Sequence, residues 1–325
     1  MGFIEAEKLM KKYDKKIAVN DISFSIEEGQ VFGILGPNGA GKSTTIFMLS
    51  TLLKPDSGDI LLNGKSMVTK PSLLRPILGL VPQDIALYPM LSARDNLNFW
   101  GRIYGIRNKN QIESRINEVA ELVGLEDKMN EKVGTFSGGM KRRLNIAAAL
   151  IHKPKVIIMD EPTVGIDVQS RSYIISAIKD LNANGATIIY TSHYIDEIEA
   201  LCHQVAIVDQ GKVLACGNIE QLRNRAGVKE KVIIKVEETG QDIAKLLLEV
   251  KTYFQDVEVN EKEENIEIAV DNVGSKLTKI LNMFDRNNLR IAEVNIEKPN
   301  LEKVYLNIIE KKEEVASVSN QPKIN

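Results

Sequence analysis

The chain has 325 residues, 43% of them apolar, which allows one to three domains with a packed core. Its formal net charge of -2 provides no overall attraction for nucleic acid, and no apolar run is long enough to span a bilayer. The N-terminus lacks the apolar core of a secretory signal, and the cysteines Cys202 and Cys216 have neither a paired nor a metal-ligand spacing. We therefore expect a protein of a reducing, cytoplasmic compartment with no membrane span of its own.

Residues 3 to 35 have the pattern of strands joined by turns. Apolar and polar residues alternate over 22–26, and a continuous apolar run follows at 31–35. The pattern predicts an antiparallel subdomain that leads into an α/β core. Tyr13 lies in a polar stretch before the alternation, where its ring could stack on a nucleotide base or be an ordinary surface tyrosine.

The apolar run leads into a glycine-rich loop, Gly36-Pro37-Asn38-Gly39-Ala40-Gly41-Lys42-Ser43. The spacing G-x-x-x-x-G-K-S between a strand and a helix predicts a phosphate-binding loop, in which successive N–H groups turn around an anion at the positive end of a helix. Lys42 is placed to reach the β- and γ-phosphates and the Ser43 hydroxyl to ligate Mg²⁺; we count Thr44, at the start of the helix, with the ATP-binding residues. The alternative is an accidental strand-to-helix turn.

The next segments predict an inserted helical subdomain. The short apolar strand 78–81 delivers Gln83 at its end, and from Ile85 the pattern becomes helical and charged. We place this subdomain at about 85–150 and expect its aromatic residues, including Trp100, to be core rather than ligand site.

Ser137-Gly138-Gly139 lies at the predicted start of a helix that runs to about Ile151. A serine and two glycines at a helix N-terminus can seat a second anion, although Ser-Gly-Gly is also a common turn. The basic triplet Lys141-Arg142-Arg143 inside this helix is expected to be a solvated face.

Two acids follow the run Val156 to Met159, which suits a strand buried on both faces of a parallel sheet. Asp160 and Glu161 then emerge at the sheet edge, where Asp160 is placed to hold Mg²⁺ through water and Glu161 to take a proton from an attacking water. The alternative is a solvated acidic loop. The strand 186–192 ends at His193, which could hydrogen-bond a γ-phosphate or be structural.

These motifs occur in the order and rough spacing of the nucleotide-binding cassette of ABC transporters, which the chain resembles over residues 1 to about 216. The resemblance implies an α/β P-loop NTPase fold with an antiparallel β subdomain and a helical subdomain, and it implies ATP and Mg²⁺ as cofactors. It also implies a role for each motif: a Walker A loop at 36–43, a Q-loop glutamine near Mg²⁺ at Gln83, a signature at Ser137-Gly138-Gly139, a Walker B aspartate at Asp160, a catalytic Glu161, a D-loop at Asp167, a switch histidine at His193 and an adenine-stacking Tyr13.

Two motifs depart from the commonest form of the family. The signature reads Phe-Ser-Gly-Gly-Met and the D-loop reads Val-Gly-Ile-Asp, but the serine, both glycines and the aspartate are present. These variants, the basic triplet and the C-terminal stretch 299–305 resemble the daunorubicin-type drug-resistance exporters, whose permease is a separate membrane protein.

A second domain is predicted after the cassette. Residues 217–230 read as a linker, and the periodicity over 231–311 gives the order β-α-β-β-α-β of a small α+β, ferredoxin-like domain. It has no cluster of catalytic residue types, so we expect a regulatory or dimer-supporting role. Residues 312–325 are charged and then small and polar, and they are expected to be disordered.

The resemblance implies an ATPase that works as a pair, either a homodimer or two different cassettes. ATP on the loop of one cassette is closed over by Ser137 and Gly139 of the other, and this motion drives a separate polytopic permease at the cytoplasmic face of the membrane. Efflux of a drug, an antibiotic or a lipid-like compound is the expected transport, with no nucleic acid involved. The alternatives are a soluble cassette ATPase that acts on ribosomes or DNA, and an importer ATPase with a regulatory tail.

Overall fold

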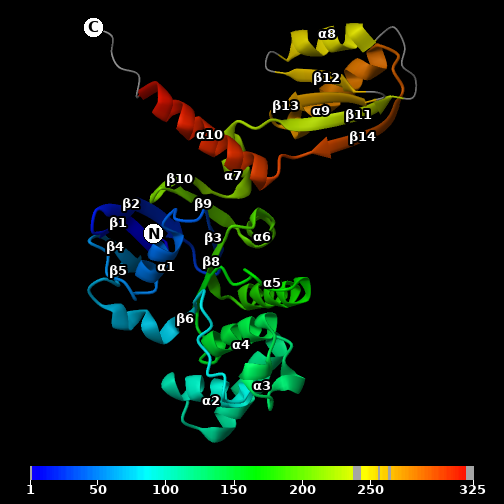
Figure 1. Ribbon diagram of the computed structural model, residues 1–325. Helices are drawn as coiled ribbons and strands as arrows, with labels where there is room; N and C mark the ends of the chain where they lie inside the picture. The colour runs from blue at the N-terminus through cyan, green and yellow to red at the C-terminus, as the bar shows by residue number, and fades with distance from the viewer. Residues whose placement is uncertain (1, 237–242, 255–256, 263–264, 320–325) are drawn as a thin grey trace, which may run out of the picture. The chain divides into compact units, whose positions relative to one another are not determined.

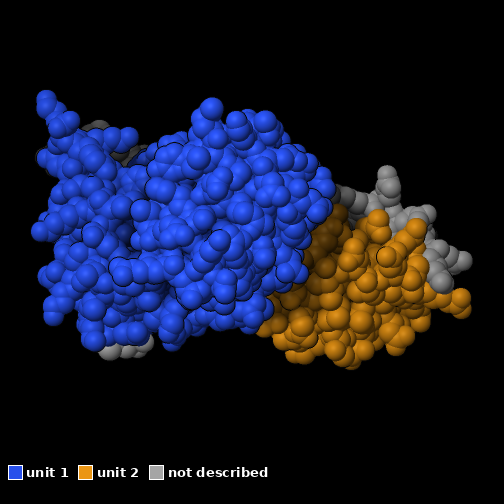
Figure 2. Space-filling view, turned by 90° about the horizontal axis from the view of Figure 1, so that it is seen from below, with its two compact units in different colours: residues 1–219 blue, residues 220–325 orange. Residues whose placement is uncertain are grey.

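The computed structural model describes residues 2–236, 243–254, 257–262 and 265–319 (Figure 1). The chain divides into two units, residues 1–219 and 220–325, which are coloured separately in Figure 2. The division falls inside the segment 217–230 that the sequence predicts to be a linker, and this segment includes the helix α7 (Ile219–Ala226).

Unit 1 begins with an antiparallel sheet, as the alternating pattern predicts. Its strands have the order β2-β1-β4-β5, and they comprise β1 (Ile4–Tyr13), β2 (Lys16–Ile26), β4 (Ser57–Leu62) and β5 (Lys65–Ser66). The apolar side of this sheet shares one hydrophobic cluster with the central sheet described next, and Phe24 stacks on Phe32 at a centroid distance of 4.8 Å. This shared core fixes the start of the chain against the strand that precedes the glycine-rich loop.

The central sheet of unit 1 brings distant parts of the sequence to one edge. Its order is β10-β9-β3-β8-β7-β6, and all neighbouring strands are parallel except β9 and β10. Leu35 pairs with Ser192, Thr191 with Asp160, and Met159 with Val81. The strands are β3 (Val31–Leu35), β6 (Leu78–Val81), β7 (Val156–Asp160), β8 (Thr187–Ser192), β9 (Gln204–Asp209) and β10 (Lys212–Gly217). Because parallel strands end at a common edge, the loops after β3, β6, β7 and β8 meet there.

The helices of unit 1 mostly start at capping residues. Ser92, Asn108, Ser137 and Asp167 cap α2, α3, α4 and α5, each accepting a hydrogen bond from the backbone N–H three residues on. The helices are α1 (Lys42–Leu49), α2 (Ala93–Ile103), α3 (Lys109–Leu122), α4 (Gly138–Leu150), α5 (Val168–Ala183) and α6 (Ile195–Leu201). Short 3₁₀ turns occur at Pro71–Leu73, Arg75–Ile77, Glu126–Lys128 and Val133–Thr135. Contacts join α2, α3 and α4 to one another, so the inserted helical subdomain is present.

Unit 2 has the predicted order of elements. A sheet in the order β12-β13-β11-β14 is antiparallel throughout, and α8 and α9 contribute apolar residues to its core. This is the ferredoxin-like arrangement. Its elements are β11 (Glu230–Val236), α8 (Ile243–Tyr253), β12 (Glu258–Lys262), β13 (Asn265–Val270), α9 (Val273–Arg286), β14 (Ile291–Glu297) and α10 (Leu301–Ser319).

The end of the chain differs from the expectation. The sequence predicts disorder over 312–325, but α10 continues to Ser319, and residues 320–325 lie outside the described part. A helix that has already formed gains one hydrogen bond for each residue added, and Glu, Ala and Lys are good helix formers, so α10 can continue past residue 311.

Candidate functional site

The glycine-rich loop follows β3 and curls back on itself before α1. Gly41 has φ of +100°, and a Cβ there would lie 2.4 Å from the carbonyl oxygen of Ala18. At Gly36 a Cβ would lie 2.1 Å from the carbonyl oxygen of Val208. The two glycines are therefore required by close packing against neighbouring backbone, and at Gly41 also by the left-handed conformation.

The backbone of the loop fits a phosphate. The N–H of Ala40 donates to Pro37, whereas those of Gly41 to Thr44 have no hydrogen-bond partner within the described part of the chain. Unpaired N–H groups at the start of a helix are the donors that anions take up, and the helix dipole favours negative charge there. The loop therefore supplies the donor set that a nucleotide phosphate needs.

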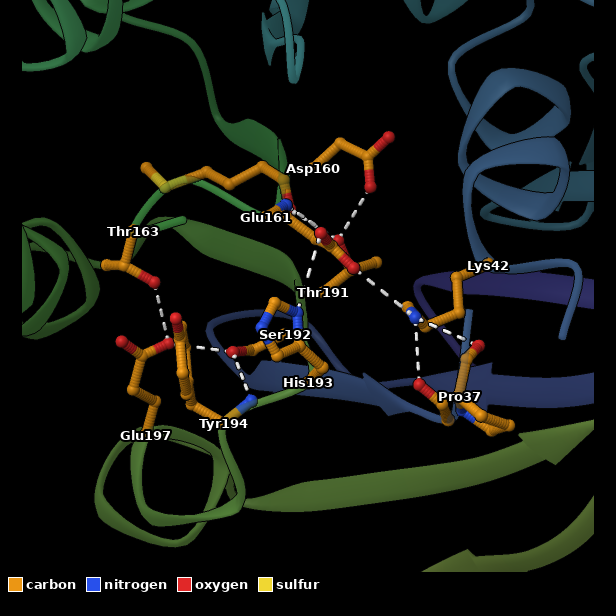
Figure 3. A network of polar contacts seen from close by, with 12 residues as sticks. Pro37, Lys42, Asp160, Glu161, Thr163, Thr191, Ser192, His193, Tyr194 and Glu197 are labelled. Carbon is orange, nitrogen blue, oxygen red and sulfur yellow. Dashed lines mark hydrogen bonds and ion pairs between the residues drawn. The ribbon is translucent and has the colours of Figure 1, made fainter. Parts of the chain in front are cut away.

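Lys42, near the end of this loop, lies close to Glu161, which follows β7. The Lys42 ammonium donates to the carbonyls of Gly36 (2.8 Å) and Pro37 (3.2 Å), and its Nζ lies 3.3 Å from Oε1 of Glu161 (Figure 3). Nδ1 of His193 lies 3.6 Å from Oε2 of the same carboxylate. Glu161 thus sits between the loop lysine and the histidine, three side chains that the sequence assigns to catalysis.

Thr191 holds the acidic pair in place, and the sequence gives no sign of this. Its hydroxyl donates to Oδ1 of Asp160 (2.8 Å) and accepts from the backbone N–H of Glu161 (2.9 Å). Glu161 has φ of +46°, a left-handed conformation that is uncommon for a residue with a side chain. The hydrogen bond to Thr191 stabilises this turn, which aims the Glu161 carboxylate back toward Lys42.

A cavity of about 580 Å³ connects these groups, a size that suits a nucleotide. Tyr13 lines this cavity and is 47% exposed, so its ring is free to stack on a nucleotide base. Asp160 does not line the cavity; it directly precedes Glu161 in the chain and is almost completely buried. The lining residues are Tyr13, Lys16, Ala18, Asn38, Gly39, Gly41, Lys42, Ser43, Thr44, Gln83, Glu161, Val164 and His193, of which the sequence does not single out Lys16, Ala18 and Val164.

A larger cavity of about 900 Å³ lies elsewhere in unit 1. It is bordered by α3 and α5 and contains none of the site residues expected from the sequence. Volume alone therefore does not locate the chemistry in this protein.

The residues expected to hold a magnesium ion would supply only a few of its ligands. Among the described residues, no group of three or more His, Cys, Asp or Glu side chains is arranged to hold a metal. Ser43 and Gln83 line the nucleotide cavity, and the buried Asp160, which precedes Glu161, accepts a hydrogen bond from Thr191. Such a set suits Mg²⁺, which keeps several waters and binds one or two carboxylates together with substrate phosphates.

The remaining expected residues gather at a second place in unit 1. Ser137 caps α4 and Asp167 caps α5, and a Cβ on Gly139 would lie 2.5 Å from Oδ2 of Asp167. The N–H and hydroxyl of Ser170 hydrogen-bond to Asp167 and hold the pKa of its exposed carboxyl below the ordinary value. None of Ser137, Gly138, Gly139 and Asp167 lines the nucleotide cavity of the same chain. The site residues expected from the sequence thus form two separate groups in one chain, which we call the two half-sites.

Near His193 in the chain, the buried carboxylate of Glu197 links α6 to β8, to α5 and to the loop after β7. Glu197 on α6 is 1% exposed, and its Oε2 accepts hydrogen bonds from the hydroxyls of Thr163 (2.8 Å), Tyr190 (2.7 Å) and Ser192 (2.8 Å) (Figure 3). Its Oε1 lies 2.6 Å from Nε of Arg171 on α5. Burial, together with the Glu197 charge, raises the pKa of the Tyr190 hydroxyl, so Tyr190 remains a donor. Glu197 stands four residues after His193 among other acids of α6, and only the fold distinguishes it.

The prediction that the basic triplet is a solvated face is wrong for two of its three residues. Arg142 is 3% exposed and Arg143 is 9% exposed. Arg143 donates to the carbonyls of Val123 and Gly124, and Arg142 donates to carbonyls of the loops after β6 and β7. Charge runs on helices are usually solvated, but an arginine can be buried when its donors find carbonyl partners.

Comparison with known proteins places this geometry in a family. A family model described as ABC transporter matches residues 19–164. The linearmycin resistance ATP-binding protein LnrL of Bacillus subtilis is 44% identical over 306 residues, 94% of this chain and 97% of that protein. The chain belongs to the ABC transporter family. Within it, the daunorubicin resistance ATP-binding protein DrrA2 of Streptomyces coeruleorubidus is 30% identical, covering 94% of each chain.

Solved structures of ABC cassettes agree with the fold and the activity. The dimeric cassette MJ0796, in a post-hydrolysis state bound to ADP and phosphate, matches with a TM-score of 0.62 and 25% identity over 66% of this chain and 98% of that one. The ATP-binding subunit of another ABC transporter matches with a TM-score of 0.63 and 28% identity over 69% and 93%. The chain is thus an ATP-binding, ATP-hydrolysing ABC subunit, and the predicted resemblance to the drug-resistance subfamily is confirmed by the two relatives. No helix in the described residues is both long and apolar enough to cross a membrane.

Proposed function

We propose that this ABC ATPase energises export through a separate polytopic permease, to which it binds as a peripheral subunit at the cytoplasmic face of the membrane. The observation that carries the proposal is the division of the site into two half-sites within one chain. Ser137 to Gly139, at the start of α4, lie outside the cavity that holds Lys42 and Glu161. A second cassette would supply them in trans, so the working unit is a pair of cassettes, as a homodimer or with a related subunit.

The proposed roles follow from the positions of the side chains. Lys42 and the N–H groups of Gly41 to Thr44 bind the β- and γ-phosphates, while Tyr13 stacks on the adenine. Glu161 accepts a proton from the attacking water and His193 hydrogen-bonds the γ-phosphate. Ser43, Gln83 and Asp160 would hold Mg²⁺, which neutralises charge on the phosphates when bound. Asp167 belongs to the surface that faces the second cassette.

The names of the relatives support export of an antibiotic or a similar drug-like or lipid-like compound. LnrL is named for resistance to linearmycin and DrrA2 for resistance to daunorubicin, and both match this chain over almost its whole length. This full-length similarity disfavours the two alternatives, a soluble ATPase of ribosomes or DNA and an importer subunit. The proposed role of unit 2 is regulation or support of the pair.

The test is to identify what the nucleotide-bound protein binds in its own cells. Tagged Glu161→Gln would be purified from detergent-solubilised membranes with ATP and Mg²⁺, because slowed hydrolysis should keep the closed pair assembled. Lys42→Ala, which should bind nucleotide weakly, is the matched control. Recovery of one polytopic membrane protein with Glu161→Gln supports the transport role. Recovery of the protein in the soluble fraction with ribosomal proteins or nucleic acid would refute that role without affecting the ATPase assignment.

A further inference from the structure

Arg142 connects the two half-sites through its hydrogen bonds. It lies one turn inside α4, whose first residues follow Ser137, and its guanidinium points into the core of unit 1. Toward the loop after β6, Nη1 donates to the carbonyls of Pro82 (2.6 Å) and Gln83 (2.9 Å). Toward the loop after β7, Nε donates to Pro162 (2.8 Å), and Nη2 donates to Glu161 (2.6 Å) and Asp160 (3.4 Å).

These bonds use the whole donor capacity of the side chain. A guanidinium has five N–H donors in a rigid planar fork, and each meets one main-chain carbonyl here. Lysine offers three donors around a single point, so it cannot make all five of these bonds. The geometry is therefore specific to arginine, and the buried charge is balanced by the nearby carboxylates of Asp84, Asp160 and Glu161.

The same helix holds the loop after β6 at a second point. Asn145, one turn further along α4, accepts a hydrogen bond from the backbone N–H of Ala86 at 3.0 Å. Arg142 and Asn145 thus fix both ends of the segment 82–86, which contains Gln83. If α4 moves, these hydrogen bonds carry the movement to Gln83. Through Arg142 they also carry it to the backbone of Glu161.

We propose that Arg142 is a positioning residue that makes hydrolysis in one half-site depend on engagement of the other. When Ser137 to Gly139 of a chain close on the nucleotide of the paired cassette, α4 shifts, and Arg142 brings Gln83 and Glu161 of its own chain into line. Occupied sites then activate each other. This inference rests on the proposed pairing of cassettes.

The test measures cooperativity of ATP hydrolysis by the full-length chain. Phosphate release would be followed against ATP concentration for the wild type, Arg142→Lys and Arg115→Lys. Arg115 is the matched control: it is also buried and donates to the carbonyls of Leu150 and Ile151 at the far end of α4, away from both half-sites. Binding of a fluorescent ATP analogue and thermal unfolding would be measured on the same samples.

The wild type is expected to give a Hill coefficient approaching about 2, the number of coupled sites. Arg142→Lys should lower it toward about 1 and reduce kcat by roughly 10-fold to 100-fold, with nucleotide affinity within about 2-fold, because only the alignment of Gln83 and Glu161 is lost. Arg115→Lys should keep the wild-type Hill coefficient even if its melting temperature falls.

Two results would overturn the inference alone: a wild-type Hill coefficient in Arg142→Lys, or an equal loss of cooperativity in Arg115→Lys. If Arg142→Lys does not fold, Arg142→Gln decides, because the two amide donors of glutamine cannot make the five hydrogen bonds of the guanidinium; an unchanged Hill coefficient there also overturns the inference. A wild type that hydrolyses ATP without cooperativity would instead count against the pairing of cassettes, and the inference would fall with it.

Discussion

At the scale of single residues, the proposed chemistry depends on Glu161. Its carboxylate lies between Lys42 and His193, and its backbone is held by Thr191 and Arg142. This position suits the carboxylate to accept a proton from a water at the end of the phosphate chain.

Glu161→Gln should separate binding from hydrolysis. Glutamine has nearly the same size and keeps a polar partner for Lys42, but it cannot accept the proton, so we expect turnover to fall about 10²-fold to 10⁴-fold while ATP affinity is largely retained. The check is phosphate release together with size-exclusion chromatography in ATP, where the variant should elute as a pair. Normal turnover in this variant would show that another group is the base.

The sequence predicts the residues of the site that belong to local patterns. The loop 36–43 has a fixed spacing, and Asp160, Glu161 and His193 each follow an apolar run, so their place at the sheet edge can be derived. Thr191, Glu197 and Arg142 have no such pattern. Their roles depend on which strands are neighbours and on which carbonyls come within reach, and these are products of the tertiary fold.

At the scale of elements, His152 joins the helical subdomain to the central sheet. It follows α4, its ring stacks on Tyr104 at the end of α2 with centroids 3.7 Å apart, and its Nε2 lies 3.0 Å from the carbonyl oxygen of Leu78 at the start of β6. A carbonyl only accepts, so Nε2 carries the proton. Nδ1 is buried without a hydrogen-bond partner in the described structure, and a second proton there would be unpaired.

This junction should weaken in mild acid. Burial lowers the pKa of His152 below its ordinary value of 6.5, and the nearby charge of Arg115 lowers it further. Below pH 6.5 the unfolded chain binds the proton more readily than the folded chain, so stability is lost as the pH falls toward the folded pKa. We expect wild-type stability to decline relative to His152→Gln between pH 7.5 and pH 5.5. Thermal melts of both proteins across this range test it, and parallel curves would refute it.

At the scale of the whole molecule, the nucleotide site belongs to one unit. Every residue that lines the cavity lies in residues 1–219, and the two units have separate hydrophobic clusters. A ligand that binds only the folded form of unit 1 stabilises that unit by RT ln(1 + [L]/Kd), about 2.7 kcal/mol at a concentration of about 100 Kd.

Calorimetry of the full chain should therefore show two unfolding transitions, of which ATP raises only one. Glu161→Gln with ATP and Mg²⁺ gives the clearest measurement, since the nucleotide survives the scan. Lys42→Ala, with weak binding, should leave both transitions in place. A single transition that ATP shifts as a whole would show that the units unfold together.

Much of this architecture can be derived from periodicity. The alternating stretch, the buried runs of the parallel sheet, the helical insertion and the order β-α-β-β-α-β of unit 2 are each visible in the sequence. The order of strands in the central sheet is not visible in the sequence. There β3 lies between β8 and β9, although about 150 residues separate β3 from β8 in the chain. The continuation of α10 to Ser319 also escapes prediction, because it depends on propagation from a helix that has already formed.

The left-handed backbone conformation of Glu161 lowers the stability of the folded protein, while its carboxylate is needed for the proposed ATP hydrolysis. A residue with a Cβ pays roughly 1–2 kcal/mol to adopt this conformation, whereas glycine adopts it freely and asparagine with less strain. Laboratory selection for survival at high temperature would therefore favour Gly or Asn at this position and would remove the carboxylate in doing so. An evolved, more durable form of this chain could be an inactive one, and any such selection must also screen for ATP hydrolysis.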